Sequence, residues 1–161
     1  GAANCVHFQD GRAVGHNTDG EGFLAPLAAF DFTLKGKSAL LLGAGGAARG
    51  VAAALRAAGA KLRVLNRSEE RARALAAPLG AGAGPLRAAA VLEPGAVAYD
   101  LVYRPADTPF LAAARKAGAR TVGGLAMLVA QAAAAWRIWF DEPVPPAIQA
   151  SARGELSRRL S

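Results

Sequence analysis

Cysteine, methionine and aromatic residues are scarce in this chain of 161 residues. It has one cysteine, Cys5, one methionine, and an aromatic content of 6%. A single cysteine cannot form an internal disulfide, which excludes a disulfide-stabilised secreted scaffold and favours a reducing, cytoplasmic location. Because 53% of the residues are nonetheless hydrophobic, with alanine in excess, the composition favours one domain of closely packed helices and strands.

Long uncharged apolar runs and long runs of one charge are also missing. The longest apolar stretch, residues 125–140, is interrupted by Gln131 and Arg137, so it predicts a buried amphipathic helix and no membrane segment. The formal net charge is +7, but the basic residues are scattered singly, which favours a phosphate site over nucleic-acid binding. His7 and His16 lie on predicted hairpin strands, and we expect no metal site.

Segments with strand character alternate with helical segments along most of the chain. Strands are predicted at residues 38–42, 61–66, 96–103 and 120–124, and helices at residues 18–30, 46–58, 68–80, 108–117, 125–140 and 146–160. This alternation predicts an α/β fold with a Rossmann-like, doubly wound parallel sheet and helices on both faces. Glycine and alanine dominate the remaining stretch, residues 80–96, which is predicted as a loop or a poor short strand.

The first residues predict a β-hairpin. Two alternating runs flank Asp10-Gly11, a strong two-residue turn signal. A lone hairpin is marginally stable in water, so we expect it to belong to a larger sheet and the chain to be part of a longer protein. We therefore divide the chain into a remnant hairpin at residues 1–18, a dinucleotide-binding domain with its linking helix at 19–140, and a C-terminal helix at 141–161.

A glycine-rich turn follows the first strand of the predicted sheet. The sequence LLLGAGGAARG ends an apolar strand and begins a helix, which is the context required of a dinucleotide fingerprint. Glycines let the backbone approach a diphosphate closely, and the N–H groups at a helix start attract the anion. The residues predicted to hold it are Gly43, Ala44, Gly45, Gly46 and Ala47. The alternative is a tight turn without a ligand.

Arginines stand at the end of the second strand, where NAD-binding proteins carry an acidic residue. An acid there bonds the ribose 2′-hydroxyl of NAD, whereas arginine accommodates the 2′-phosphate of NADP. The segment predicted to select NADP consists of Asn66, Arg67, Ser68 and Arg71. The alternative is that these arginines are surface residues paired with Glu69 and Glu70. That alternative suits Arg73 better, because it lies further along the helix.

Five stretches of the sequence resemble the shikimate dehydrogenase family in the family's own order. GAANCV resembles its GAVNTV, and GHNTDGEGF resembles its G-x-N-T-D-G-x-G-F. The segments LLLGAGGAARGV and NRSEERARALA resemble its cofactor loop and the arginine segment after it. The stretch YDLVYRPADTPFLAAARKAGA resembles its D-x-V-Y-N-P region, and GGLAMLVAQAA resembles its G-x-x-M-L-x-x-Q-A helix.

This resemblance implies a reaction, namely the reduction of 3-dehydroshikimate to shikimate with NADPH in aromatic amino acid biosynthesis. It assigns a catalytic and substrate-binding role to Asp19 and substrate-binding roles to Asn4, Tyr103 and Gln131. It also places Leu101 and Gly124 beside the nicotinamide half of NADP. The implied partners are the small-molecule substrate and either a second copy in a homodimer or a missing N-terminal domain.

The sequence also departs from the family pattern. The family's N-terminal substrate domain, with its serine pair and catalytic lysine, has no match, and none of the four lysines of this chain replaces that lysine. Nothing in residues 80–96 matches the family's N-A-T-P strand, so residues 38–42 are expected to pair with residues 97–102 unless a segment is missing. Arg104 stands where the family has asparagine. The alternative functions are a non-catalytic NADP-binding module and a related quinate/shikimate-type dehydrogenase.

Overall fold

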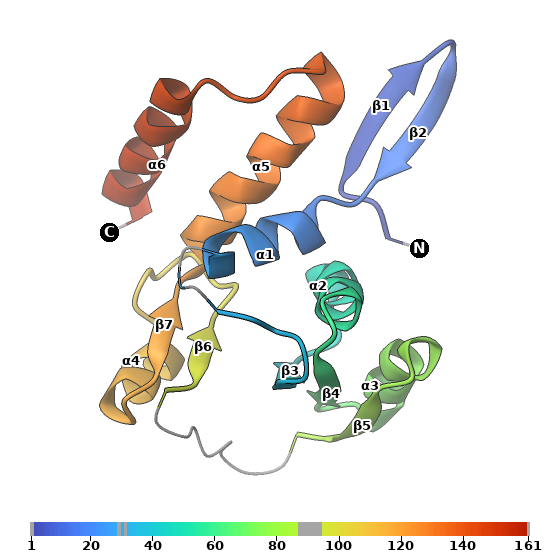
Figure 1. Cartoon of the computed structure of the whole chain (residues 1–161), viewed down its shortest axis with the longest axis vertical. Helices are drawn as coiled ribbons and strands as arrows, with labels where there is room; N and C mark the ends of the chain where they lie inside the picture. Colours follow the sequence, from blue (N-terminus) through green and yellow to red (C-terminus); the bar gives the residue numbers. More distant parts are fainter. Residues whose placement is uncertain (1, 29, 31, 87–94, 161) are drawn as a thin grey trace. The chain divides into compact units, whose positions relative to one another are not determined.

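The computed structural model describes residues 2–28, 30, 32–86 and 95–160 (Figure 1). The chain divides into two compact units, Gly1–Ala88 and Ala89–Ser161. The three-part division expected from the sequence stays a prediction.

The first unit opens with the predicted hairpin. Strands β1 (Cys5–Gln9) and β2 (Arg12–His16) pair antiparallel, with Cys5 opposite His16 and Gln9 opposite Arg12. Asp10 and Gly11 between them have φ angles of 50° and 73°. A turn with two positive φ angles matches the twist of a hairpin, and Asp and Gly are residues that adopt it. Helix α1 (Asp19–Ala28) follows and buries Phe23 and Leu27.

A three-stranded parallel sheet forms the centre of the first unit. Strands β3 (Ser38–Leu42), β4 (Lys61–Asn66) and β5 (Gly82–Pro85) lie in the order β3-β4-β5. Helix α2 (Gly46–Ala57) contacts β3 and β4, and helix α3 (Glu69–Ala76), continued by the 3₁₀ turn η1 (Ala77–Leu79), contacts β4 and β5. Small side chains and the fully buried Val51 and Val64 fill the space between sheet and helices.

Strand β5 resolves the ambiguity left by residues 80–96. Its residues Gly82, Ala83, Gly84 and Pro85 have little strand propensity, yet they pair in register with residues 63–66 of β4. The ladder on the neighbouring strand stabilises a sequence that would not form a strand alone. Residues 87–94 lie outside the described part of the chain. The described strands form separate β3-β4-β5 and β6-β7 ladders, and the expected pairing of residues 38–42 with 97–102 is not among them.

The second unit contains a short parallel pair of strands and three helices. Strand β6 (Val97–Tyr99) pairs with β7 (Arg120–Val122), and helix α4 (Pro109–Lys116) packs on both. Their core consists of Ala98, Ala114 and Ala119, with Ala96 and Phe110 against it. Helices α5 (Gly124–Phe140) and α6 (Pro146–Leu160) contact each other. The α/β prediction with parallel sheets and covering helices is thus confirmed.

Two details of the second unit differ from expectation. The strand predicted over residues 96–103 is shorter, because after Tyr99 the Asp100 carboxylate accepts a hydrogen bond of 3.0 Å from the Val102 N–H and turns the backbone. A tryptophan is usually well buried, but Trp139 is 49% exposed, since it lies in the last turn of α5. Met127 is buried, and Trp136 packs against Phe140 with tilted rings whose centroids are 4.4 Å apart.

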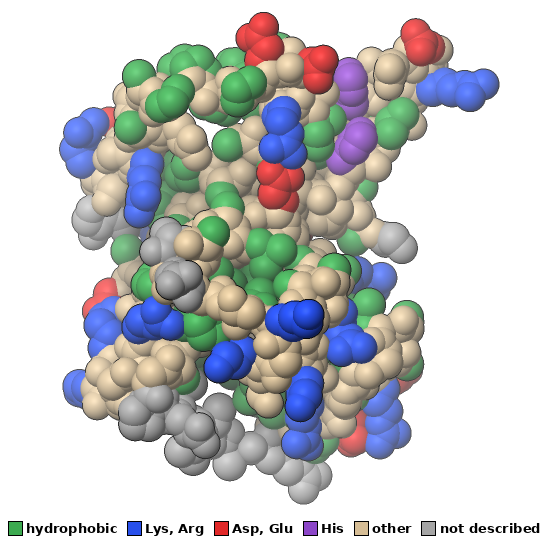
Figure 2. Space-filling view, in the orientation of Figure 1, with side chains coloured by type: hydrophobic (Ala, Val, Ile, Leu, Met, Phe, Trp, Pro, Cys, Tyr) green, Lys and Arg blue, Asp and Glu red, His purple; other side chains and the backbone are tan. Residues whose placement is uncertain are grey.

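Basic side chains are spread over the surface that Figure 2 shows. On the face shown in Figure 2, Lys and Arg side chains lie singly or in small groups between hydrophobic and neutral ones. None of the helices in the described residues is both long and apolar enough to cross a bilayer.

Candidate functional site

The glycine turn lies between β3 and α2 with open space around it. Gly43 has a φ of 112°, which favours glycine, and its N–H donates a hydrogen bond of 2.8 Å to the Leu65 carbonyl. A Cβ atom built on Gly43, Gly45 or Gly46 would meet no atom within 4 Å. Helix α2 begins at Gly46 after the N-cap residue Gly45, which supplies no side-chain cap. The absent side chains therefore leave the helix start accessible to an anion.

The arginine segment leaves the end of the adjacent strand. Ser68 caps α3 by accepting a hydrogen bond of 3.3 Å from the Arg71 N–H, and the Asn66 side-chain amide donates one of 3.1 Å to the Ser68 carbonyl. These bonds fix the loop that carries Arg67. Arg67 and Arg71 are exposed, and no ion pair to either is found within residues 2–28, 30, 32–86 and 95–160. Arg73 instead pairs with Glu69 at 2.7 Å, as expected of a surface helix residue.

These two segments meet at one edge of the sheet. Leu42 lies opposite Leu65 in the parallel ladder of β3 and β4. The bond from Gly43 to Leu65 therefore joins the start of the glycine turn to a residue only two positions before Arg67. Open parallel sheets bind ligands at the carboxyl ends of their strands. The geometry suits one extended ligand with a diphosphate at the glycine turn and a further phosphate near the guanidinium groups.

A polar cluster connects the hairpin to the start of α1. The Asn4 side-chain amide donates hydrogen bonds of 2.7 Å to Asp19 Oδ1 and 3.1 Å to Thr18 Oγ1. Its Oδ1 atom accepts a bond of 2.8 Å from the Thr18 N–H. Asn17 Oδ1 accepts a bond of 3.0 Å from the Asp19 N–H. Asn4 and Asp19, predicted on separate motifs, are thus in direct contact, with polar atoms that can bind hydroxyl groups.

Three more of the predicted site residues lie near the start of α5 in the second unit, namely Leu101, Tyr103 and Gly124. Gly124 lies so close to the segment after β6 that a Cβ atom on it would overlap the Leu101 carbonyl oxygen. Only glycine permits this approach. Tyr103, Gly123 and Gly124 line a hollow of about 170 Å³, to which α6 contributes Arg153. Gln131 lies further along α5, where its side-chain amide donates to the Leu128 carbonyl at 3.1 Å, and it is not among the residues of this hollow.

Sequence reasoning missed several residues that shape these sites. Thr108 caps α4 by accepting a bond of 3.2 Å from the Leu111 N–H, and its hydroxyl donates a bond of 2.6 Å to Asp100 Oδ2. The Thr-Pro pair at the helix start signals this cap. Gly20 and Gly50, which let α1 and α2 approach each other, were also missed. The spacing of Gly46, Gly50 and Ala54 along one face of α2 is the signal that could have found them.

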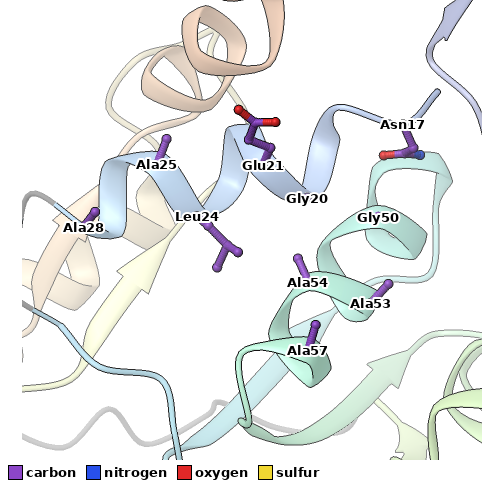
Figure 3. A pocket seen from close by; sticks show the side chains of 10 residues that line it. All are labelled: Asn17, Gly20, Glu21, Leu24, Ala25, Ala28, Gly50, Ala53, Ala54 and Ala57. Atoms are coloured by element: carbon purple, nitrogen blue, oxygen red, sulfur yellow. The ribbon is translucent and has the colours of Figure 1, made fainter. Parts of the chain in front are cut away.

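Helices α1 and α2 also flank an open apolar hollow of about 690 Å³ (Figure 3). Its walls are residues of the two helices and Asn17, which precedes α1. None of the residues predicted to bind substrate or cofactor lines it. No group of three or more His, Cys, Asp and Glu side chains in the described residues is arranged to hold a metal ion.

Comparison with known proteins identifies the family of this chain. The sequence profile described as Shikimate / quinate 5-dehydrogenase matches residues 26–103, and the one described as Shikimate 5'-dehydrogenase C-terminal domain matches residues 124–148. A curated shikimate dehydrogenase (NADP(+)) of Thermus thermophilus is 42% identical, over 97% of this chain and 68% of the relative. The chain belongs to the shikimate dehydrogenase family.

Two solved structures share the fold of this chain. A Thermus thermophilus shikimate 5-dehydrogenase in complex with NADP(H) and shikimate is 37% identical, with a TM-score of 0.76 over 95% of this chain and 66% of that one. The ligand-free 5-ketofructose reductase of a Gluconobacter strain is 31% identical, with a TM-score of 0.82 over 97% of this chain and 69% of that one.

The chain is shorter than its relatives in this family. It covers between 61% and 64% of the length of three curated shikimate dehydrogenases. The alignment with the curated Thermus thermophilus enzyme extends over 182 residues but includes only 97% of these 161 residues. The relative therefore has residues without a counterpart here. Residues 80–96, where the sequence departs from the family pattern, are the place where we expect this difference.

Proposed function

We propose that this chain is the NADP-binding part of a shikimate dehydrogenase, which reduces 3-dehydroshikimate to shikimate. The observation that carries the proposal is the meeting of the glycine turn and the arginine segment at one sheet edge, through the bond between Gly43 and Leu65. Family membership supports the activity, because curated relatives at up to 42% identity are NADP(+)-dependent shikimate dehydrogenases. The cytoplasmic location stays a prediction. The protein partner, either a second copy of the chain or an N-terminal domain, stays a prediction as well.

The residues present fit this cofactor. Open space above Gly45 and Gly46 accommodates a diphosphate against the backbone N–H groups at the start of α2. Arg67 and Arg71 would hold the 2′-phosphate, and Asn66 and Ser68 shape the loop that presents them. NADPH supplies the hydride when bound. Leu101 and Gly124 would border the nicotinamide half.

The polar residues of the chain would bind the ring and handle the proton. Asn4 and Asp19 would bind neighbouring substrate hydroxyls, and their mutual bond of 2.7 Å holds the Asp19 carboxylate in one orientation. In this arrangement Asp19 would assist proton transfer to the carbonyl oxygen that becomes a hydroxyl. Tyr103 and Gln131 would be further contacts of the substrate ring.

The decisive experiment compares the affinities of NADP and NAD in arginine variants. Each charge-assisted hydrogen bond contributes roughly 1.5–3 kcal/mol, so Arg67→Ala should weaken NADP binding by about tenfold to a hundredfold and leave NAD binding nearly unchanged. Arg71→Ala should act in the same direction. Titration calorimetry or protein fluorescence measures both dissociation constants.

Arg73→Ala is the matched control, because Arg73 belongs to the same helix as Arg71 but pairs with Glu69. It should alter neither affinity by more than about twofold. Equal losses of affinity for NADP and for NAD in Arg67→Ala would contradict the role of Arg67 in binding the 2′-phosphate. Oxidation of shikimate would exclude the alternative, a non-catalytic NADP-binding module, whereas NADP binding without turnover would fit either that module or the isolated NADP-binding part of the enzyme.

A related dehydrogenase with a different substrate is the second candidate. The observation in its favour is that 5-ketofructose reductase is a structural neighbour at 31% identity. Arg104, which replaces the family's asparagine beside Tyr103, is the further difference near the substrate residues. Assays with shikimate, quinate and fructose as hydride donors to NADP separate these alternatives. Faster oxidation of quinate or fructose than of shikimate would select the second candidate.

A further inference from the structure

Arg153 occupies a place in the second unit that the proposed function leaves unassigned. It lines the hollow of about 170 Å³ together with Tyr103, Gly123 and Gly124. Tyr103 comes from the segment after β6 and the two glycines from the start of α5, whereas Arg153 comes from α6. The remaining walls are alanine and leucine residues, so Arg153 is the charged side chain of this lining.

The positive charge of Arg153 has no carboxylate partner among residues 95–160 or elsewhere in the described chain. The neighbouring arginines of α6 behave differently, because Arg158 and Arg159 both bond to Glu155, at 2.5 Å and 2.6 Å. These two bonds lower the pKa of the Glu155 carboxyl below its ordinary value. In helix α6, therefore, Arg158 and Arg159 are neutralised by Glu155, whereas the Arg153 guanidinium beside the hollow has no such partner in the described residues.

We propose that Arg153 makes the site prefer reduced NADPH over oxidised NADP+. This inference rests on the proposed function, which assigns two residues to the nicotinamide half: Gly124, which lines the same hollow, and Leu101, whose carbonyl lies against Gly124. The two cofactor forms carry the same phosphates and differ by one positive charge on the nicotinamide ring. A guanidinium near that ring repels the oxidised form and leaves the neutral reduced form unaffected.

The expected size of the preference follows from Coulomb's law. Arg153 is exposed on α6, so solvent and salt screen its field. For charges roughly 8–10 Å apart in such surroundings, repulsion changes the affinity ratio of the two forms by roughly threefold to tenfold. The preference favours reduction of a ketone substrate and release of the oxidised cofactor. Attraction of Arg153 to the phosphates raises both affinities alike and cancels in the ratio.

The test measures Kd for NADPH and for NADP+ with the full chain at low salt. In the unaltered chain the ratio of Kd for NADP+ to Kd for NADPH should exceed one. Arg153→Gln should lower this ratio roughly threefold to tenfold, and Arg153→Lys, which keeps the charge, should retain most of it. Arg158→Gln removes one positive charge from the same helix outside the hollow and should leave the ratio unchanged. Added salt should reduce the ratio of the unaltered chain and not that of Arg153→Gln.

Three outcomes would overturn the inference. If Arg153→Gln weakens the binding of both cofactor forms by the same factor, Arg153 acts on a phosphate and not on the charge of the nicotinamide ring. If Arg153→Gln and Arg158→Gln shift the ratio equally, the ratio depends on the net charge of the chain and not on the position of Arg153. If Arg153→Gln binds both forms with the same affinities as the unaltered chain, the guanidinium lies too far from the nicotinamide ring to affect binding. Failure of the proposed cofactor site is distinguishable, because the unaltered chain would then bind neither form. An unfolding curve for each variant confirms that the fold is retained.

Discussion

Gly50 of α2 lies directly against Asp19 of α1. A Cβ atom on Gly50 would come within 2.9 Å of the Asp19 Cβ and 2.6 Å of the Asn17 Oδ1 atom. Just beyond, a Cβ on Gly20 would lie 3.1 Å from the Gly50 carbonyl oxygen. Because α2 starts at the glycine turn and α1 starts at Asp19, this crossing ties the predicted phosphate loop to the predicted catalytic carboxylate (Figure 3).

Substitution of Gly50 by alanine should therefore be destabilising, although alanine is the better helix former. The added methyl group must displace Asn17 and Asp19, and overpacking of this kind costs about 1–3 kcal/mol. Denaturant unfolding measures the change. Gly154→Ala in α6 is the control, since a Cβ there meets nothing within 4 Å, and it should stabilise by roughly 0.5–1 kcal/mol. Equal effects of the two substitutions would contradict the close crossing.

The bond between Asn4 and Asp19 should be measurable as a coupling energy. Asn4→Ala removes the amide that donates to Asp19 and also the acceptor of the Thr18 N–H, so it should cost about 1–2 kcal/mol of unfolding free energy. A double-mutant cycle with Asp19→Ala isolates the pair, and we expect a coupling of roughly 0.5–1.5 kcal/mol, because the pair is partly solvated. Additive effects of the two substitutions would show that the bond does not hold Asp19.

Local signals in the sequence predicted most of the first unit. Asp10-Gly11 favours a tight turn, and Ser68 is a capping residue before two glutamates. The apolar run 38–42 before the glycine turn predicts a strand, although Leu40 and Leu42 in it are 45% and 43% exposed. Each of these features depends on residues that are close in sequence. For this reason single-sequence patterns were sufficient to place the glycine turn and the arginine segment at the same sheet edge.

Features that depend on distant residues were not predictable in the same way. Strand β5 exists through its pairing with β4, since its own residues favour a loop. The strand at residues 96–103 ends early because Asp100 accepts hydrogen bonds from both Thr108 and Val102. Arg153 stands in an exposed helix of ordinary composition, and only the fold shows that it lines the same hollow as Tyr103.

Thr108 should contribute more to stability than the other helix cap of similar chemistry, Ser68. Thr108 is 6% exposed, and its hydroxyl both accepts from Leu111 and donates to Asp100. Thr108→Val removes both bonds and leaves the Asp100 oxygen without this donor, so it should cost about 2–3 kcal/mol. Ser68→Ala removes one longer bond at an exposed position and should cost about 0.5–1 kcal/mol. Denaturant unfolding of both variants tests the order, and a larger loss for Ser68→Ala would refute it.

Alkaline pH should destabilise the second unit through Tyr99. Burial raises the pKa of the Tyr99 hydroxyl above its ordinary value of 10.0, so the unfolded chain loses this proton at a lower pH than the folded chain. The stabilising effect is complete below about pH 10 and diminishes as pH rises toward the folded pKa. Unfolding free energy measured between about pH 8 and 11 should therefore fall less steeply for Tyr99→Phe than for the unaltered chain. Tyr103, the second tyrosine, is 45% exposed, and Tyr103→Phe should keep the steeper slope. Identical slopes in the two variants would show that Tyr99 ionises as freely in the folded chain as in the unfolded one.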